Sequence, residues 1–144
     1  MSRTVAYVNA PVERVFEVLL DPTTYAYWVV GAKQIRAVED AWPQPGSGFH
    51  HTVGVGPFAT RDETRVVRID EPSLLELEAR AWPAGQARVR MELSGEGDRT
   101  RVVMKEEPSA GPAKRLHNPL LDALTHVRNT VALKRLARVA EGRL

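Results

Sequence analysis

The feature that most constrains this chain is a run of extended segments between residues 46 and 107, joined by very short turns. Each segment alternates apolar and polar residues, as a half-buried strand does, over residues 47–55, 60–70, 74–82, 86–93 and 100–106. The connections are rich in turn-forming Gly, Pro, Asp and Ser, at residues 70–73, 83–85 and 95–98. Because a parallel crossover needs a dozen residues or more, these short connections force neighbouring strands to pair antiparallel.

One long helical pattern follows the strands, over residues 116–140. We expect this helix to begin at Pro119 with Asn118 as its N-cap, because proline fits the first turn of a helix. Its first half carries an apolar stripe of Leu120, Leu121, Leu124, Val127 and Val131. Its second half turns the apolar side by about a quarter turn, through Ala132, Leu136, Val139 and Ala140. The first half is therefore predicted to roof a cavity above the sheet, and the second half to pack on the core.

Two short helices are predicted near the start of the chain. A strand over residues 3–9, with Val5 and Tyr7 on its apolar side, ends before Pro11. Helical spacing then places one set of apolar residues on a buried face: Val12, Val15, Phe16, Leu19 and Leu20. Asp21 is expected to cap a second helical turn that runs to Trp28. A further strand follows over residues 32–39.

The composition is that of one globular domain over residues 1–144. The chain contains no cysteine, which excludes disulfides, thiolate metal sites and cysteine nucleophiles. The first residues lack the basic and apolar regions of a signal peptide, and no apolar stretch is long enough to span a bilayer. We therefore expect a cytoplasmic protein.

Charge is unevenly distributed along the chain. Residues 113–144 hold seven Lys or Arg and two acidic residues, a net charge of +5, which leaves −3 for residues 1–112. A basic helix marks either an anionic partner or a solvated face whose last charges suit the helix dipole. We favour the solvated face.

The last three strands each have one apolar and one charged side. Their charged sides carry Glu76, Glu78, Arg88, Arg90, Glu92 and Arg101. This pattern predicts a sheet covered on one face and wet on the other, with the three arginines paired to the glutamates of neighbouring strands. Over residues 60–70 the alternation changes phase, which predicts a bulge near residues 65–67.

Five local motifs occur in a fixed order along the chain: Ala10-Pro11-Val12-Glu13-Arg14-Val15-Phe16; Asp21-Pro22 followed by Tyr25 and Trp28; the turn from Trp42-Pro43 to Gly46; Asp70-Glu71-Pro72 before Leu74-Leu75; and Thr100-Arg101-Val102 after a glycine turn. With this order of elements, the chain resembles the SRPBCC or START-like superfamily, the helix-grip fold of birch pollen allergen relatives. The resemblance covers essentially the whole chain. Within the superfamily the chain looks like the bacterial polyketide cyclase/dehydrase-like group.

The resemblance implies an α+β helix-grip fold. In that fold a curved antiparallel sheet, here of about seven strands, wraps around a long C-terminal helix, and two short helices follow the first strand. A ligand cavity between sheet and helix is implied as well. The resemblance does not identify the ligand, because the superfamily includes lipid carriers, hormone receptors, aromatases and cyclases.

Familiar catalytic signatures are absent from the sequence, namely a glycine-rich phosphate loop, G-x-S-x-G and H-E-x-x-H. His50 and His51 are adjacent, so on a strand they point to opposite faces and cannot bind one metal ion together. His117 and His126 are far apart in helical phase, and His126 lies opposite the apolar stripe. We predict no metal site and no cofactor.

His51 is the sharpest single catalytic candidate. Its parity with Phe49 and Val53 places it under the helix, where a neutral imidazole could act as acid or base. The alternative is a buried histidine that is hydrogen-bonded to a neighbour.

Glu106 and Arg128 are the other two weak catalytic candidates. Glu106 shares the parity of Val102 and Met104, so it is predicted to point inward unless the end of the strand frays into solvent. Arg128 falls inside the apolar stripe, where a guanidinium needs an anion unless its stem carries the charge to water. We hypothesise that the two side chains meet within the cavity.

The predicted ligand-binding set joins aromatic residues of the first half of the chain to residues of the last strand and helix: Tyr25, Trp28, Phe49, His51, Phe58, Met104, Leu120, Leu121, Leu124 and Arg128. Trp28 beside Phe58 is expected to form a mouth suited to flat apolar ligands. Trp42 and Trp82 precede prolines in turns and are expected to be packing plugs.

These observations together predict binding of a small hydrophobic molecule, aromatic or polyketide-like, between sheet and helix. One alternative is a polyketide cyclase, aromatase or dehydratase acting in the same cavity. A second is a non-catalytic interaction or resistance module. We expect no integral membrane association. We also expect no binding of nucleic acid, since no stacking aromatics lie among the basic residues. A homodimer is compatible with the sequence.

Overall fold

The computed structural model describes residues 2–29, 32–53, 60–81, 85–115 and 119–142. Its elements, in chain order, are β1 (Ser2–Val8), α1 (Val12–Leu19), the 3-10 helix η1 (Pro22–Thr24), α2 (Tyr25–Trp28), β2 (Ala32–Val38), β3 (Gly48–Val53), β4 (Thr60–Asp70), β5 (Leu74–Ala81), β6 (Gly85–Glu96), β7 (Arg99–Ala110), α3 (Pro112–Arg115) and α4 (Pro119–Ala140). The predicted strands are all present, and the long helix begins at Pro119 as expected. The short helix α3 was not predicted.

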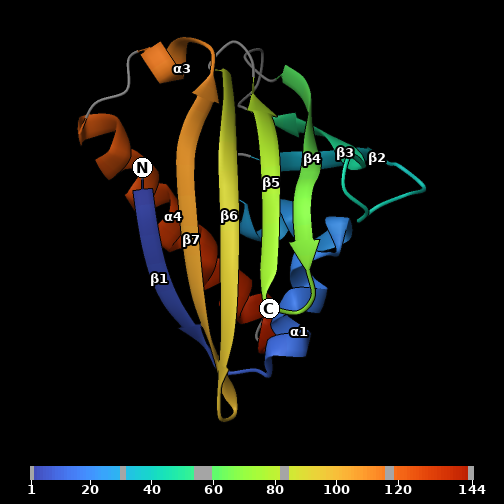
Figure 1. The fold of residues 1–144 in the computed structure, drawn as a ribbon, viewed down its shortest axis with the longest axis vertical. Coiled ribbons are helices and arrows are strands. Elements are labelled where there is room, and N and C mark those ends of the chain that lie inside the picture. The colour runs from blue at the N-terminus through green and yellow to red at the C-terminus, as the bar shows by residue number, and fades with distance from the viewer. Residues whose placement is uncertain (1, 30–31, 54–59, 82–84, 116–118, 143–144) are drawn as a thin grey trace.

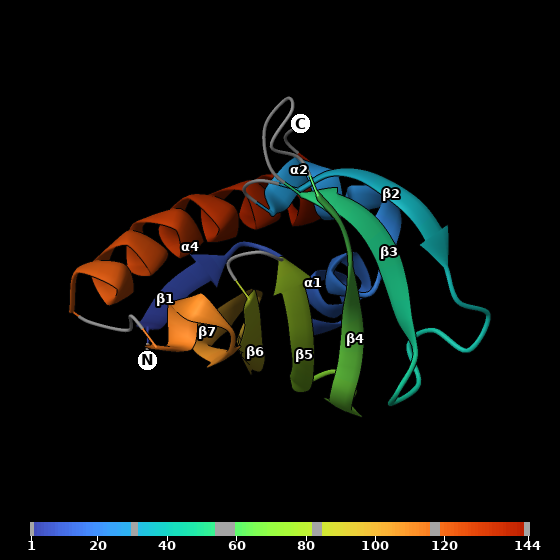
Figure 2. The ribbon, with the colours of Figure 1, turned by 90° about the horizontal axis from the view of Figure 1, so that it is seen from above.

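All seven strands form one antiparallel sheet in the order β1-β7-β6-β5-β4-β3-β2 (Figure 1). β1 therefore pairs with β7 and forms one edge of the sheet, and β2 forms the other edge. The sheet curves strongly, and α1, α2 and α4 lie on its concave side (Figure 2). This arrangement confirms the predicted α+β helix-grip fold.

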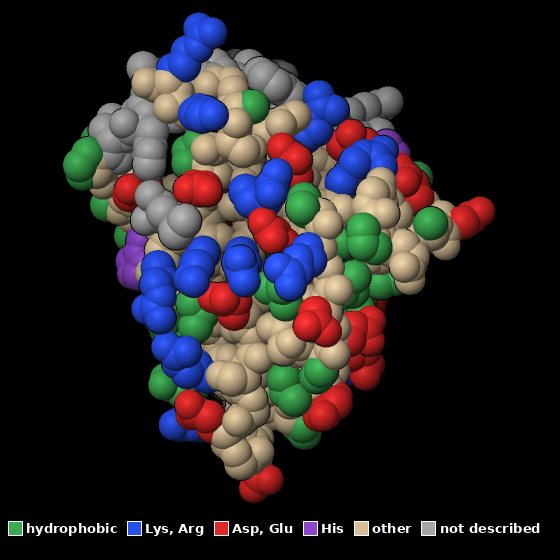
Figure 3. Space-filling model, in the orientation of Figure 1, with side chains coloured by type: hydrophobic (Ala, Val, Ile, Leu, Met, Phe, Trp, Pro, Cys, Tyr) green, Lys and Arg blue, Asp and Glu red, His purple; other side chains and the backbone are tan. Residues whose placement is uncertain are grey.

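The convex face of the sheet carries interleaved charges (Figure 3). Arg88 Nη1 lies 3.3 Å from Glu76 Oε1, and Arg88 Nη2 lies 3.6 Å from Glu78 Oε2. Arg90 Nε lies 3.4 Å from Glu92 Oε2. The predicted cross-strand pairing is therefore confirmed for Arg88, whereas Arg90 pairs with a glutamate of its own strand. The Nε atoms of both arginines have no hydrogen-bond partner among the described residues. Arg101 lies across from Tyr7 and Ser94 instead of a glutamate.

The predicted bulge in β4 is present. The register between β4 and β5 shifts between Val66 and Arg68, so Val67 has no partner in that ladder. Val66 is buried in the core, whereas Val67 is exposed. The bulge thus rotates the end of β4 and turns Ile69 toward the core, where it packs as a half-buried residue.

The face assignment of β1 was wrong. The sequence placed Val5 and Tyr7 on the covered side, but both are exposed, while Ser2, Thr4 and Val8 are buried. Arg99 lies over the ring of Tyr7, 4.2 Å from the ring centroid, on the outside of the sheet. The covered side of β1 is therefore partly polar.

The short helices form as predicted. Pro11 is the N-cap of α1, which buries Val15, Phe16, Val18 and Leu19. Asp21 caps η1 by accepting hydrogen bonds from the Thr23 amide (3.0 Å) and the Thr23 hydroxyl (2.6 Å).

α4 presents opposite sides to the sheet in its two halves. Its second half buries Ala132, Leu133, Leu136, Ala137, Val139 and Ala140. In its first half Leu120, Leu124, Val127 and Val131 are 67%, 58%, 61% and 36% exposed. At about 3.6 residues per turn, these two apolar sides lie roughly half a turn apart, not a quarter turn. The predicted apolar roof is therefore wrong, because most of the stripe of the first half faces away from the sheet.

Candidate functional site

The first half of α4 turns a polar side toward the sheet. His126 Nδ1 lies 3.0 Å from the Thr4 hydroxyl oxygen, on the covered side of β1. Asn129, one turn further along the helix, is 1% exposed. The polar side of the helix thus packs against the partly polar side of β1, and α4 contacts β1 along this seam.

Glu106 and Arg128 meet beneath α4, which confirms the contact hypothesised from the sequence; the cavity around it stays a prediction. The Arg128 guanidinium donates through Nη2 to Glu106 Oε2, and the same nitrogen lies 3.5 Å from Asn129 Oδ1. The Glu106 side chain is 10% exposed and that of Arg128 is 44% exposed. The arginine thus reaches inward from a half-exposed position to neutralise a carboxylate that β7 places on its covered side.

Tyr25 extends this polar region from α2. Its hydroxyl lies 3.5 Å from the Thr64 hydroxyl of β4, and both residues are buried. Burial raises the pKa of the Tyr25 phenol, and the Glu106 carboxylate raises it further. The Thr64 hydrogen bond and the positive charge of Arg128 oppose the rise. Tyr25 is therefore a neutral hydrogen-bonding group at neutral pH, not a phenolate.

Five side chains from four elements make up what we call the inner polar cluster: Tyr25 of α2, Thr64 of β4, Glu106 of β7, and Arg128 and Asn129 of α4. Among the described residues, the buried Asn129 Nδ2 has no hydrogen-bond partner. A buried amide without a partner costs free energy, so this donor is suited to an oxygen of a bound molecule. The cluster thus offers a neutral phenol, a carboxylate–guanidinium pair and an unused amide donor.

Aromatic rings pack beside the inner polar cluster. The Tyr25 ring makes edge contacts with Trp28 (centroids 5.6 Å apart) and Phe49 (4.7 Å), and Phe49 contacts Trp42 (5.0 Å). Trp42 also donates its indole N–H to the Leu20 carbonyl (2.8 Å), so the predicted packing role of Trp42 is confirmed. The buried indole nitrogen of Trp28 has no hydrogen-bond partner within the described ranges. The polar cluster thus has an apolar, aromatic wall.

The predicted ligand-binding residues fall into three groups. Four of them, Tyr25, Trp28, Phe49 and Met104, are buried on the concave side, and Arg128 joins the inner polar cluster. Leu121 is half-buried, but Leu120 and Leu124 were placed wrongly, because the helix directs them away from the sheet. The remaining predictions concern residues outside the described part of the structure: the His51 side chain, Phe58, Trp82, His117 and Asn118.

Two members of the cluster were missed from the sequence. Thr64 stands between charged neighbours in a segment whose phase changes, so its burial was not evident. Asn129 follows Arg128 on a side of the helix that looked solvent-facing, because the apolar stripe was taken as the inner side. The sequence offered no signal for either residue, because Thr4 and His126, on the polar sides of β1 and α4, also lay on sides predicted to face solvent.

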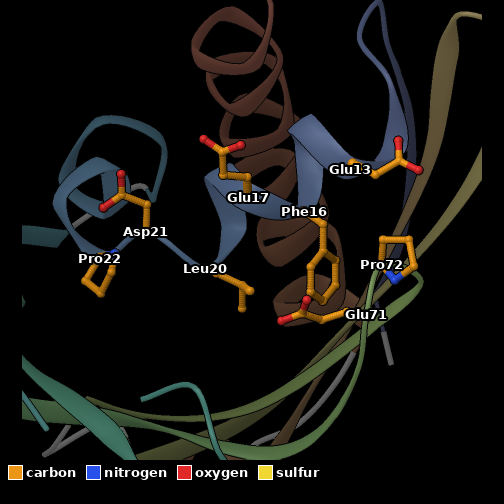
Figure 4. Close-up of a pocket in the computed structure, with 8 residues that line it drawn as sticks. All are labelled: Glu13, Phe16, Glu17, Leu20, Asp21, Pro22, Glu71 and Pro72. Carbon is orange, nitrogen blue, oxygen red and sulfur yellow. The ribbon is translucent and has the colours of Figure 1, made fainter. Parts of the chain in front are cut away.

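A surface groove of about 760 Å³ lies elsewhere, between α1, η1 and the turn that joins β4 and β5 (Figure 4). It is lined by Glu13, Phe16, Glu17, Leu20, Asp21, Pro22, Glu71 and Pro72. The carboxylates of Glu17 and Asp21 are already engaged, by Arg14 and by Thr23. No member of the inner polar cluster lines this groove, so we do not regard it as the functional site.

One trio of the described residues has the composition of a metal site. Ligand atoms of Glu39, His50 and Glu63 lie within 4.8 Å of one another. However, Arg65 donates to Glu39 Oε1 (3.1 Å) and Oε2 (2.8 Å) and to Glu63 Oε2 (2.9 Å). The guanidinium thus already supplies the positive charge that a metal ion would bring. This trio was not predicted, because Glu39, His50 and Glu63 are separated by more than ten residues each and only the fold brings them together.

Replacing Arg65 with Met should make the stability of the protein less sensitive to acid. Arg65 lowers the pKa values of Glu39 and Glu63, and Arg80 lowers that of Glu63 further. A lowered pKa gives stability that is complete above the unfolded value of about 4.5 and is lost as the pH falls through the folded value. The urea midpoint of Arg65→Met should therefore be lower at pH 7 and approach that of the wild type toward about pH 3. Arg68 is exposed on the same strand, so Arg68→Met should show the pH dependence of the wild type. If the urea midpoints of Arg65→Met and the wild type differed by the same amount at every pH, the ion pairs of Arg65 would not be the source of the acid sensitivity.

The phenol of Tyr25 should ionise later than an ordinary tyrosine. Its raised pKa gives stability that is complete below the unfolded value of about 10 and is lost as the pH rises through the folded value. An alkaline titration followed by tyrosinate absorbance should show a late step that Tyr25→Phe lacks. Tyr27→Phe, a change at an exposed ring, should retain that step. A late step that persists in Tyr25→Phe would assign it to another group.

A curved antiparallel sheet around a long C-terminal helix defines the helix-grip class of fold, here with polar groups on its inner side. The chain belongs to the family described as polyketide cyclase / dehydrase and lipid transport, whose pattern matches residues 2–141. A search among curated proteins found no matching sequence.

Solved structures of the same fold cover nearly all of this chain. DynU16, from the dynemicin biosynthetic locus, is 21% identical with a TM-score of 0.71, and the match covers 97% of this chain and 46% of DynU16. A protein from Chromobacterium violaceum is 19% identical with a TM-score of 0.69, covering 96% of this chain and 95% of that protein. For one from Thermus thermophilus the values are 19% and 0.70, with coverage of 98% and 97%. At these identities the likeness shows the fold alone.

Proposed function

We propose that the protein binds a small hydrophobic molecule, aromatic or polyketide-like, between the concave side of the sheet and α4. The observation that carries the proposal is the buried Asn129 amide, which lacks a hydrogen-bond partner among the described residues and lies beside the Glu106–Arg128 pair. A ligand whose apolar body packs on the aromatic wall and whose oxygen accepts from Asn129 would satisfy both surfaces. Membership in a family that includes lipid transport supports this function.

A second candidate function is catalysis of a cyclisation, aromatisation or dehydration in the same site. The neutral Tyr25 phenol and the Glu106 carboxylate favour it, because a donor and an acceptor of protons approach one interior region. In this role Tyr25 would donate to a substrate carbonyl oxygen, Glu106 would accept a proton, and Arg128 would hold Glu106 in place. The family description includes cyclases and dehydrases, which supports the same reading.

Native mass spectrometry of the protein purified from its own host tests the binding proposal. We expect a small molecule of defined mass to remain bound to the wild type. Asn129→Leu, which keeps the size of the side chain and removes the donor, should lower its occupancy at least about tenfold, as loss of a buried hydrogen bond implies. Leu124→Ser, on the outer side of the same helix, should leave occupancy unchanged.

Two results would overturn the proposal. One is a wild-type protein that carries no ligand and binds none of a panel of aromatic polyketides added to it. The other is full retention of ligand by Asn129→Leu. If the bound molecule is recovered chemically altered after incubation, the catalytic alternative replaces simple binding.

A further inference from the structure

The outer side of α4 carries an aliphatic stripe that the fold leaves uncovered. Leu120, Leu124, Val127 and Val131 recur at spacings of four, three and four residues, so they line one side of the helix over about 16 Å. Three of them are more than half exposed. A contiguous apolar surface of this kind on a soluble fold marks a site of contact with another phase or molecule. We call it the outer stripe.

Basic side chains continue and flank the outer stripe. Lys134, Arg135 and Arg138 are exposed in the next two turns, and helical geometry places them within about a quarter turn of the line of the stripe. The acidic residues of this region lie elsewhere. Asp122 is half-buried on the opposite side of the helix, and Glu141 accepts a hydrogen bond from the Asn9 amide (2.8 Å). The outer side of α4 is therefore apolar at its start and cationic at its end.

The charges argue against a second copy of this chain as the partner. In a parallel pair of α4 helices, Lys134, Arg135 and Arg138 would face their own copies. In an antiparallel pair they would approach the start of the partner's helix, which follows the exposed Lys114 and Arg115 of α3. Both orientations bring like charges together, which opposes self-association. An anionic partner with an apolar layer removes the conflict.

We propose that the outer stripe and Lys134, Arg135 and Arg138 dock α4 on the surface of an anionic lipid bilayer. The helix lies in the plane of the interface, with its aliphatic side chains at the boundary between headgroups and acyl chains. The long basic side chains extend to the anionic headgroups. None of the helices in the described part of the chain is long and apolar enough to cross a bilayer, so this contact is peripheral. Docking would set the helix that bears Arg128 and Asn129 directly against the membrane.

Sedimentation of the full chain with lipid vesicles tests this proposal. Vesicles of equal phosphatidylcholine and phosphatidylglycerol should bind the wild type at least about tenfold more tightly than phosphatidylcholine alone, and added salt should weaken the binding. The triple change Lys134→Ala, Arg135→Ala and Arg138→Ala should lower affinity roughly 100-fold, at about fivefold for each cation. Leu124→Ser with Val127→Ser should lower it at least about tenfold through lost apolar burial.

A matched triple change separates a local surface from net charge. Arg3→Ala, Arg68→Ala and Arg101→Ala remove the same number of charges from strands of the sheet and should leave affinity within about threefold. The proposal is overturned if this control weakens binding as much as the α4 triple, or if the wild type ignores anionic vesicles. It is also overturned if ultracentrifugation shows a dimer that Leu124→Ser with Val127→Ser dissociates. Unchanged circular dichroism of each variant confirms that the fold is intact.

Discussion

Replacing Arg128 with Met should lower the free energy of unfolding by about 2 kcal/mol. The change leaves the Glu106 carboxylate, 10% exposed, without its cation beneath α4. Breaking a fully buried ion pair by removing one partner costs about 3–5 kcal/mol. The Arg128 side chain is 44% exposed, so solvent screening places this pair below that range. Urea denaturation at neutral pH measures the loss.

The double variant Arg128→Met with Glu106→Gln is the matched test of the mechanism. Glutamine keeps the shape of glutamate and removes the charge, so the double variant should regain at least about half of the stability lost by Arg128→Met. Arg135→Met, a change at an exposed arginine of the same helix, should alter stability by less than about 0.5 kcal/mol. A double variant no more stable than Arg128→Met would show that the stranded charge is not the cause.

The order and pairing of the strands could be predicted because local chemistry determined them. Three turns too short for a parallel crossover fixed antiparallel pairing from residue 60 onward, and the observed sheet follows it. The β4 bulge could be predicted because the positions that carry charged residues in the first half of the strand carry apolar residues in the second half. Caps such as Asp21 were readable because an Asp before a proline satisfies the first amides of a helix.

The orientation of two elements could not be predicted by assuming that apolar residues face inward. β1 buries Ser2 and Thr4, and α4 buries Asn129 and directs Nδ1 of the exposed His126 to the Thr4 hydroxyl. These elements pack against each other, so the rule failed on both sides of one contact. The hydrogen bond between Thr4 and His126 offsets part of the cost of this burial, whereas Ser2 Oγ and Asn129 Nδ2 have no hydrogen-bond partner among the described residues.

The candidate site could be predicted only where a residue contradicted its surroundings strongly. Glu106 on an apolar strand face and Arg128 within an apolar helix side were each conspicuous, and opposite charge suggested that they meet. Thr64 and Asn129 are uncharged and common on surfaces, so nothing in the sequence distinguished them. Such residues are found where a residue that the sequence pattern places at the surface is in fact buried, and only the structure shows that burial.

The clearest test of the half-turn change along α4 is a pair of leucine truncations. Leu136→Ala should lower the free energy of unfolding by about 2–5 kcal/mol, because Leu136 is fully buried among the core residues and its removal leaves a cavity. Leu124→Ala should change it by less than about 0.5 kcal/mol, because Leu124 is mostly exposed on the outer stripe. Urea denaturation measures both under one condition. If Leu124→Ala cost as much as Leu136→Ala, the first half of α4 would bury its apolar side after all, and both the polar inner side and the bilayer-docking surface would have to be abandoned.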